Sequence, residues 1–181
     1  MNKVSIAISA CLIGQRVRYD GKQKAHAVIM DVFLKRYADK LNLIPFCPEV
    51  AIGLGVPRAK IQVVRQKNKQ IRVLGVEDHT LDVTEALQSY AERFLSLYPD
   101  LRYCLVKSKS PSCGWLSTPI FAQSNSANKD SDKASLLPRS QESELGSGLF
   151  IQSLHHLKPE LIIIEDTQLD SEDACLALLL D

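Results

Sequence analysis

The sequence carries almost no net charge and contains no long hydrophobic run. Its 22 lysine and arginine residues nearly balance its 21 aspartate and glutamate residues, which leaves a formal net charge of +1. A chain so close to neutral gives no global electrostatic reason to bind a nucleic acid such as transfer RNA, although a local basic patch is compatible with this total. No apolar run approaches the ~20 residues that span a bilayer, so we predict no membrane-spanning segment.

A short apolar stretch, from Val4 to Ala10, follows the first residues of the sequence. It is shorter than the core of a secretory signal, it is strand-like in composition, and no convincing cleavage site follows it. We therefore expect a cytoplasmic protein.

Cysteine pairs of the C-x-x-C type are also absent, although the sequence contains 5 cysteines. Their absence excludes a zinc ribbon and a thioredoxin-type motif. An odd number of cysteines in a chain expected in the cytoplasm argues against a disulfide framework and favours reduced thiols or a metal site. Such a metal site would have to be assembled from distant loops. The cysteines are Cys11, Cys47, Cys104, Cys113 and Cys175.

The composition, with 45% hydrophobic and 24% charged residues, is typical of a soluble globular protein, and 181 residues fit one domain over 1–181. Apolar strands alternate with amphipathic helices, which predicts an α/β fold: a three-layer, Rossmann-like domain with a mainly parallel sheet. The core strands are predicted at 4–9, 43–46, 103–106 and 161–164. The helices are predicted at 27–41, from Asp82 or Thr84 to the residues before Pro99, at 148–157 and at 171–180.

Two further segments interrupt this alternation. Apolar runs at 61–65 and 70–74 flank a polar turn, and we predict that they form a hairpin added at the edge of the sheet. Residues 123–143 are rich in serine, asparagine, lysine and aspartate, a composition that predicts a mobile surface insertion.

Three of the cysteines follow the ends of predicted core strands. The carboxyl ends of parallel strands meet at the same edge of a sheet, so we expect Cys11, Cys47 and Cys113 to lie together there. Three thiolates suit zinc or an iron–sulfur cluster, and a missing fourth protein ligand is typical of a metal that takes part in chemistry. Cys104 lies within a predicted strand and Cys175 within the last helix, so both are predicted to be packing residues.

Other polar residues stand near these thiols. Glu49 follows Cys47 by two residues, directly after the same predicted strand. A carboxylate there could transfer protons to or from a bound molecule. Asp20 reads as a turn residue that could line the site. Arg58, Lys107 and Lys109 are candidates to pair with Glu49 or to contact phosphate.

Four short segments give a more specific indication. They resemble, in the same order, the signature segments of the thiouracil desulfidase family, and the similarity covers residues 3–121 and resumes around Gly148. The segments read SACLIG at 9–14, VRYDG at 17–21, CPE at 47–49 and SPSCG at 110–114.

The resemblance implies a 4Fe–4S cluster held by Cys11, Cys47 and Cys113, with one iron lacking a protein ligand. It also implies catalytic roles for Glu49 and for a serine of the SPSCG segment. We favour Ser110 as the catalytic serine. Ser112, Asp20 and Arg58 are then candidates for contact with the substrate.

The implied reaction is a non-redox conversion of thiolated pyrimidines, of the 2-thiouracil, 4-thiouracil or thiouridine type, to the oxo form with release of sulfide. The expected partner is therefore a small thiolated base or nucleoside. Residues 52–58 resemble more closely a branch that is fused to a second helical domain and linked to 4-thiouridine in transfer RNA. Two alternatives remain from the residues alone: a zinc hydrolase using the same thiols, and a cluster-binding sensor or scaffold without turnover.

Overall fold

The computed structural model describes residues 3–122 and 142–177 of the chain. The mobile insertion predicted at 123–143 therefore lies outside the described residues, except for its last two positions. Those two positions begin a strand, β7 (Glu142–Gly146). Within the described ranges, no helix has the length and apolar character needed to cross a membrane.

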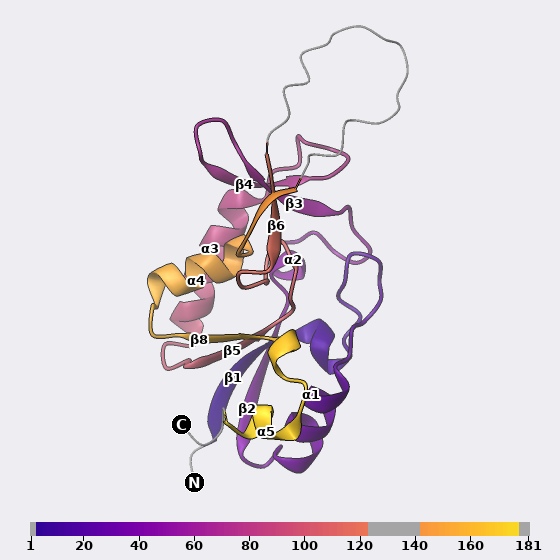
Figure 1. Cartoon of the computed structure of the whole chain (residues 1–181), viewed down its shortest axis with the longest axis vertical. Coiled ribbons are helices and arrows are strands. Elements are labelled where there is room, and N and C mark those ends of the chain that lie inside the picture. The colour runs from indigo at the N-terminus through magenta and orange to yellow at the C-terminus, as the bar shows by residue number, and fades with distance from the viewer. Residues whose placement is uncertain (1–2, 123–141, 178–181) are drawn as a thin grey trace, which may run out of the picture.

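The predicted parallel sheet forms the lower half of the molecule in Figure 1 and is called sheet A here. All three pairs of neighbouring strands are parallel, so none of them is a hairpin. Their order across the sheet is β2 (Leu41–Phe46), β1 (Val4–Ser9), β5 (Tyr103–Val106) and β8 (Ile162–Glu165).

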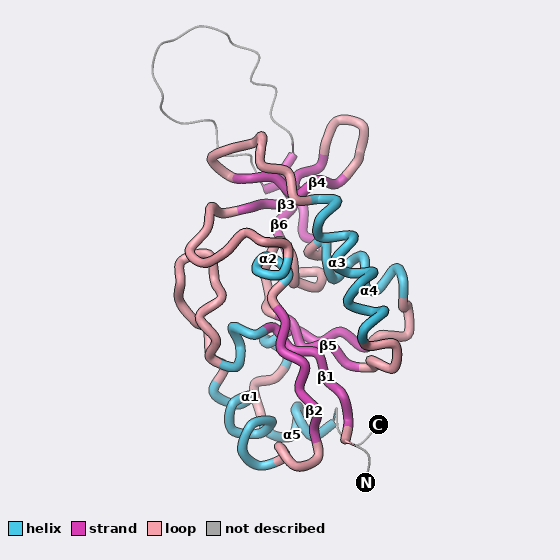
Figure 2. Tube along the Cα trace, turned by 180° about the vertical axis from the view of Figure 1, so that it is seen from behind, coloured by secondary structure: helices cyan, strands magenta, loops and turns pink. Residues whose placement is uncertain are grey.

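Helices cover both faces of sheet A, which confirms the predicted three-layer α/β arrangement. Successive residues of β1 point to opposite faces, so Ala7 packs into one apolar cluster while Ile6 and Ile8 pack into the other. On the Ala7 side lie α3 (Thr84–Leu97) and α4 (Leu149–Leu157), which run side by side in Figures 1 and 2. The other side is covered by α1 (Ala27–Asp31), the π-helical turn η2 (Val32–Arg36) and α5 (Glu172–Ala177).

The hairpin predicted at the edge of the sheet forms, but it belongs to a second sheet, called sheet B. Its strands β3 (Ile61–Arg65) and β4 (Ile71–Gly75) are antiparallel, with Ile61 opposite Gly75. A strand that the sequence pattern did not indicate, β6 (Thr118–Ala122), pairs parallel to β3, so the hairpin joins β6 and not sheet A. The order of sheet B is β4, β3, β6 and β7.

The helix predicted at 27–41 is shorter than expected. Helical structure ends at Arg36, and Leu41 begins β2 opposite Val4 of β1. Leu41 fits the helical spacing of apolar residues, and it is buried as that spacing predicts. It is buried as part of a strand, however, and not as part of a helix.

Short helical segments follow three strands of sheet A at their carboxyl ends. These segments are η1 (Ala10–Ile13) after β1, α2 (Pro48–Ala51) after β2 and η3 (Asp166–Gln168) after β8. In Figure 1, α2 lies between the two sheets.

Phe150 of α4 packs between the helical layer and sheet A. Its ring is fully buried, with centroids 5.4 Å from Phe46 of β2 and 5.1 Å from Tyr90 of α3. We expect Phe150→Ala to lower the free energy of unfolding by about 3–5 kcal/mol, because it removes a large buried side chain and leaves a cavity. Denaturant unfolding would measure the change.

Leu97→Ala is the matched control, since Leu97 lies on α3 and is 71% exposed. Its free energy of unfolding should change by less than about 0.5 kcal/mol. Equal effects of the two substitutions would contradict the packing described for Phe150.

Candidate functional site

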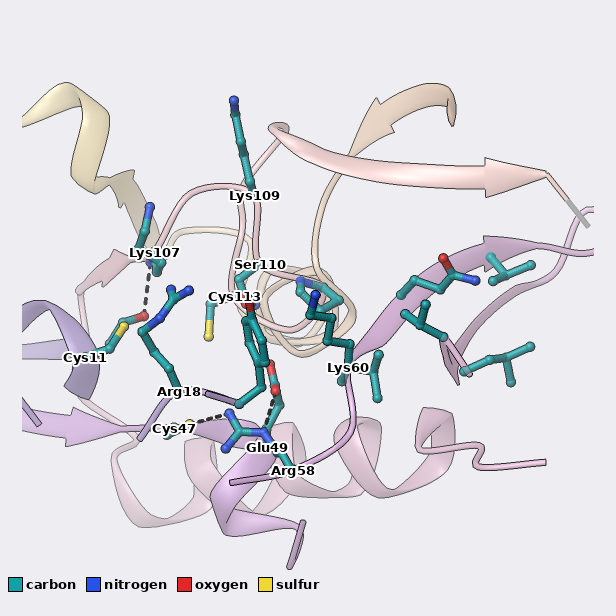
Figure 3. A pocket seen from close by; sticks show the side chains of 18 of the residues that line it. Cys11, Arg18, Cys47, Glu49, Arg58, Lys60, Lys107, Lys109, Ser110 and Cys113 are labelled. Carbon is teal, nitrogen blue, oxygen red and sulfur yellow. Dashed lines mark hydrogen bonds and ion pairs between the residues drawn. The ribbon is translucent and has the colours of Figure 1, made fainter. Parts of the chain in front are cut away.

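A cavity of about 920 Å³ lies between the carboxyl edge of sheet A and sheet B. Residues that follow β1, β2 and β5 line one side, and residues of β3, β4 and β6 line the other. Figure 3 shows part of this cavity from close by. In such sheets, ligands bind outside the carboxyl ends of the strands, so the cavity is where the fold class would place a site.

Cys11, Cys47 and Cys113 all line this cavity, as their positions after strands predicted. Cys11 belongs to η1, Cys47 directly precedes α2, and Cys113 lies in the loop after β5. In Figure 3 their sulfur atoms lie around one common space. Cys104 and Cys175 are fully buried in the two apolar clusters, in agreement with their predicted packing role.

The pKa values of Cys11 and Cys113 respond to the neighbouring thiols. The pKa of Cys11 is raised to about 11, first by burial and then by the charge of Cys47, while the Arg18 and Lys107 cations oppose this shift. Burial raises the pKa of Cys113 well above its usual value, and Cys47, Glu49 and Cys11 add to the shift. A hydrogen bond from Ser9 favours the Cys113 thiolate. Cys11 and Cys113 therefore each lie within electrostatic reach of the Cys47 thiol.

In the part of the chain that the structure describes, no three histidine, cysteine or acidic side chains come together closely enough to hold a single metal ion. The ligands of an iron–sulfur cluster bind different iron atoms, and three cysteines that line one cavity could supply such ligands.

Glu49 lines the same cavity and is held from two sides. It lies in the first turn of α2, two residues after Cys47, and its side chain is only 12% exposed. Its Oε2 accepts a hydrogen bond from Arg58 Nε at 2.8 Å, and its Oε1 accepts one from Ser112 Oγ at 3.0 Å. A buried carboxylate needs a cationic partner, and Arg58 provides it.

Arg58 was expected to contact the substrate, but its guanidinium is committed to the protein. Besides the ion pair with Glu49, it donates to the carbonyl oxygens of Gly55 and Val17, both at 2.9 Å. Its side chain is 4% exposed, although part of it reaches the cavity wall. Arg58 thus ties two loops to Glu49 and orients that carboxylate.

The two serines of the SPSCG segment have different surroundings. Ser110 lines the cavity, and its Oγ accepts hydrogen bonds from the amides of Cys113, at 3.1 Å, and Ser112, at 3.4 Å. Its own hydroxyl proton can therefore be donated to another group. Ser112 is fully buried, does not line the cavity, and reaches it only through its hydrogen bond to Glu49.

Asp20 lies outside the cavity lining. It is an exposed turn residue that accepts a hydrogen bond from the Lys22 amide at 3.1 Å and pairs with Arg18 at 3.5 Å. Of the residues expected to contact a substrate, the structure brings Arg58 to the cavity wall and leaves Asp20 and Ser112 away from it.

Several cavity residues were not predicted to line it. Tyr19 lies there with cations over its ring: Lys60 Nζ is 5.2 Å and the Arg18 guanidinium carbon 5.5 Å from the ring centroid. Arg18 and Tyr19 belong to the VRYDG segment, which is a signal for their position, whereas no sequence pattern indicated Lys60.

The two lysines that were candidates to pair with Glu49 have other surroundings. Lys107 lines the cavity but pairs with Asp166, at 2.8 Å, instead of Glu49. The Lys109 side chain extends away from the thiols in Figure 3.

Comparison with known proteins agrees with this geometry. The family model described as 2-thiouracil desulfurase matches residues 6–166. The chain therefore belongs to the 2-thiouracil desulfurase family and is an enzyme that cleaves a carbon–sulfur bond. This result sets aside the sensor or scaffold without turnover.

Among solved structures, the chain is similar to the 4Fe–4S-dependent thiouracil desulfidase TudS. The two share 31% sequence identity with a TM-score of 0.66, and the match covers 100% of each chain. A search of curated proteins found no match.

The buried pair of Glu49 and Arg58 makes a direct prediction about stability. We expect Arg58→Ala to lower the free energy of unfolding by about 3–5 kcal/mol, because it leaves the Glu49 carboxylate buried without a cation. In a Glu49→Gln background the same substitution should cost less, since no charge is then stranded. Denaturant unfolding of the four variants of this double-mutant cycle measures the coupling.

Arg65→Ala serves as the control for this cycle. Arg65 pairs with Glu144 on sheet B, but the two side chains are 38% and 44% exposed. Loss of such an exposed pair should cost no more than about 1 kcal/mol. If Arg58→Ala lowered the free energy of unfolding no more than Arg65→Ala does, the stabilising role given to the Arg58–Glu49 pair would be contradicted.

Proposed function

We propose that this enzyme uses a 4Fe–4S cluster to convert thiolated pyrimidines, of the 2-thiouracil, 4-thiouracil or thiouridine type, to their oxo forms with release of sulfide. One observation carries the proposal: three thiols from three strand ends share one cavity with an oriented carboxylate, Glu49. The similarity to a desulfidase described as 4Fe–4S-dependent supports the choice of cofactor.

Cys11, Cys47 and Cys113 are the residues that would hold the cluster. A thiol must lose its proton to bind iron, and cations near these sulfur atoms favour that loss: Arg18 and Lys107 beside Cys11, and Arg58 beside Cys47. With one iron left without a protein ligand, the bound cluster would supply a Lewis acid with affinity for the soft sulfur of a thiocarbonyl group.

Glu49 is assigned to proton transfer. Arg58 and Ser112 fix both of its carboxylate oxygens, so its orientation is set before a substrate enters. Glu49 takes a proton from the water that attacks the thiocarbonyl carbon, and returns that proton to the departing sulfide. The overall reaction exchanges C=S and water for C=O and hydrogen sulfide, so no external electron donor is needed.

Ser110 is assigned to contact with the pyrimidine ring. Two amides donate to its Oγ, so its hydroxyl proton can point to a ring nitrogen or to an oxygen on which negative charge develops. Ser112 and Arg58 act on the same reaction through Glu49 and not through the substrate. Asp20 supports the turn that carries Arg18.

The ligand assignment predicts which cysteine substitutions abolish cluster binding. Cys11→Ala, Cys47→Ala and Cys113→Ala should each lose most of the iron and acid-labile sulfide after anaerobic reconstitution, because each removes one of three protein ligands. Iron and sulfide analysis and the visible absorption of the cluster measure this loss.

Cys104→Ala is the matched control, because Cys104 is a buried thiol of β5 that does not line the cavity. It should keep the wild-type iron content. A colourless wild-type protein with one zinc and no iron would refute the cluster proposal, as would cluster loss in Cys104→Ala equal to that in Cys113→Ala.

The role of Glu49 predicts a separation between cluster binding and turnover. Glu49→Gln should keep the cluster but release sulfide from 2-thiouracil and 4-thiouridine about 10²–10⁴ times more slowly, because the amide cannot accept the proton. Glu85→Gln, an exposed substitution on α3, should leave the rate unchanged. Wild-type rates in Glu49→Gln would show that Glu49 does not transfer the proton.

The same assay distinguishes the substrate classes. Free base, nucleoside and thiolated transfer RNA should be compared at equal concentration and across a range of salt. Contacts with a phosphate backbone weaken steeply as salt rises, so only activity on transfer RNA should be lost at high salt.

A further inference from the structure

Two buried carboxylates at the end of β8 contact the loop that carries Cys113, although neither lines the cavity. The first is Asp166. Its Oδ1 accepts a hydrogen bond from the Ser108 amide at 2.8 Å, and its Oδ2 pairs with Lys107 Nζ at 2.8 Å. Burial by itself would raise the pKa of Asp166, but the hydrogen bonds from Lys107 and Ser108 hold it below its usual value. Asp166 thus fastens the beginning of the loop, directly after β5.

The second carboxylate, Glu165, fastens the end of the same loop. Its Oε1 accepts hydrogen bonds from the Trp115 amide, at 2.6 Å, and from Ser117 Oγ. Ser117 Oγ in turn accepts a hydrogen bond from the Lys109 amide at 2.8 Å, so Glu165 also closes the base of the loop. Adjacent residues of one strand end therefore hold the chain on both sides of Cys113.

The loop needs this support because its backbone is strained at two places. Lys109 and Leu116 have φ angles of 58° and 62°, in the left-handed region that side chains disfavour. Both lie where the carboxylates act: the Lys109 amide binds Ser117, and Leu116 directly follows Trp115. Without external hydrogen bonds, the loop would relax to other conformations.

The third side of the loop packs against the start of α4. The amides of Gly148 and Leu149 donate to the carbonyl oxygens of Gly114, at 2.8 Å, and Pro111, at 3.0 Å. A Cβ atom at Gly148 would lie 2.7 Å from the Cys113 nitrogen, so the two segments are in direct contact. The ends of the loop have one further hydrogen bond each, because the Lys107 amide donates to Ser9 Oγ and the Leu116 amide donates to Ser147 Oγ, both at 3.1 Å. The carboxylates add to these bonds at both ends.

We propose that Glu165 and Asp166 are positioning residues, which hold both ends of the 107–117 loop and thereby place Cys113 and Ser110 at the cavity. Their acceptor oxygens do this by binding backbone amides of the loop, and neither touches the reacting atoms. The roles of Cys113 and Ser110 rest on the proposed function, whereas the placement of the loop does not.

Residue-resolved thiol alkylation of the full chain, freed of cluster and shown to be folded by circular dichroism, tests the proposal. In Glu165→Ala and Asp166→Ala, alkylation of Cys113 should accelerate about fivefold or more, because local opening of the loop exposes the thiol. Cys104 and Cys175 provide internal controls, since both are fully buried outside the loop and should react at wild-type rates.

Conservative variants separate positioning from a general loss of stability. Glu165→Gln and Asp166→Asn keep an oxygen that accepts the Trp115 or Ser108 amide, so they should accelerate Cys113 alkylation much less than the alanine variants. Asp170→Asn, an exposed substitution close by, should have no effect. In the reconstituted enzyme, chelators should remove iron faster from the alanine variants than from the conservative ones.

Three results would overturn the proposal: an unchanged Cys113 rate in both alanine variants, parallel acceleration of all five thiols, or conservative variants that react as fast as the alanine variants. If the wild-type chain binds no cluster, the proposed function fails while the alkylation test still decides the role of Glu165 and Asp166.

Discussion

Parallel pairing of β1, β2 and β5 is the constraint on which the site depends. Strands that run in one direction end at one edge of the sheet, so residues separated by more than thirty positions in sequence come together there. Cys11, Cys47 and Cys113 each follow one of these ends, and β8, the fourth parallel strand, brings Glu165 and Asp166 to the same edge. An antiparallel arrangement of any one of these strands would send its side chains to the opposite edge.

The carboxyl edge of sheet A also concentrates buried charge, and each buried carboxylate has its own partners. Glu49 pairs with Arg58, Asp166 pairs with Lys107, and Glu165 accepts hydrogen bonds from the loop. Removing such groups from water is costly, and buried ion pairs seldom add net stability. Their value here is in orientation, because each carboxylate fixes a segment that bears a site residue.

Sheet B gives the cavity its second wall and its size. Without β3, β4 and β6 the thiols would lie on an open edge, and the cavity of about 920 Å³ would have no far side. The sequence indicated the β3–β4 hairpin but not the sheet to which it belongs. That sheet depends on β6, which is short, contains Pro119 and shows little alternation of polar and apolar residues in its sequence. Residues such as Lys60 and Tyr19 meet at the cavity only because sheet B stands opposite sheet A.

The sequence alone determined the α/β class, most of the core strands, the three thiols at one edge and the acid beside Cys47. These features follow from local composition, from apolar periodicity and from the direction rule of parallel strands, all of which act along short segments. Only the tertiary structure decided the partners of each polar side chain. Arg58 forms an ion pair with Glu49, and Ser112 donates a hydrogen bond to Glu49 instead of lining the cavity. Glu165 and Asp166 accept hydrogen bonds from the loop that carries Cys113. Each of these contacts joins residues from separate segments, and their pairing depends on how two sheets and several loops pack, which no spacing along the chain encodes.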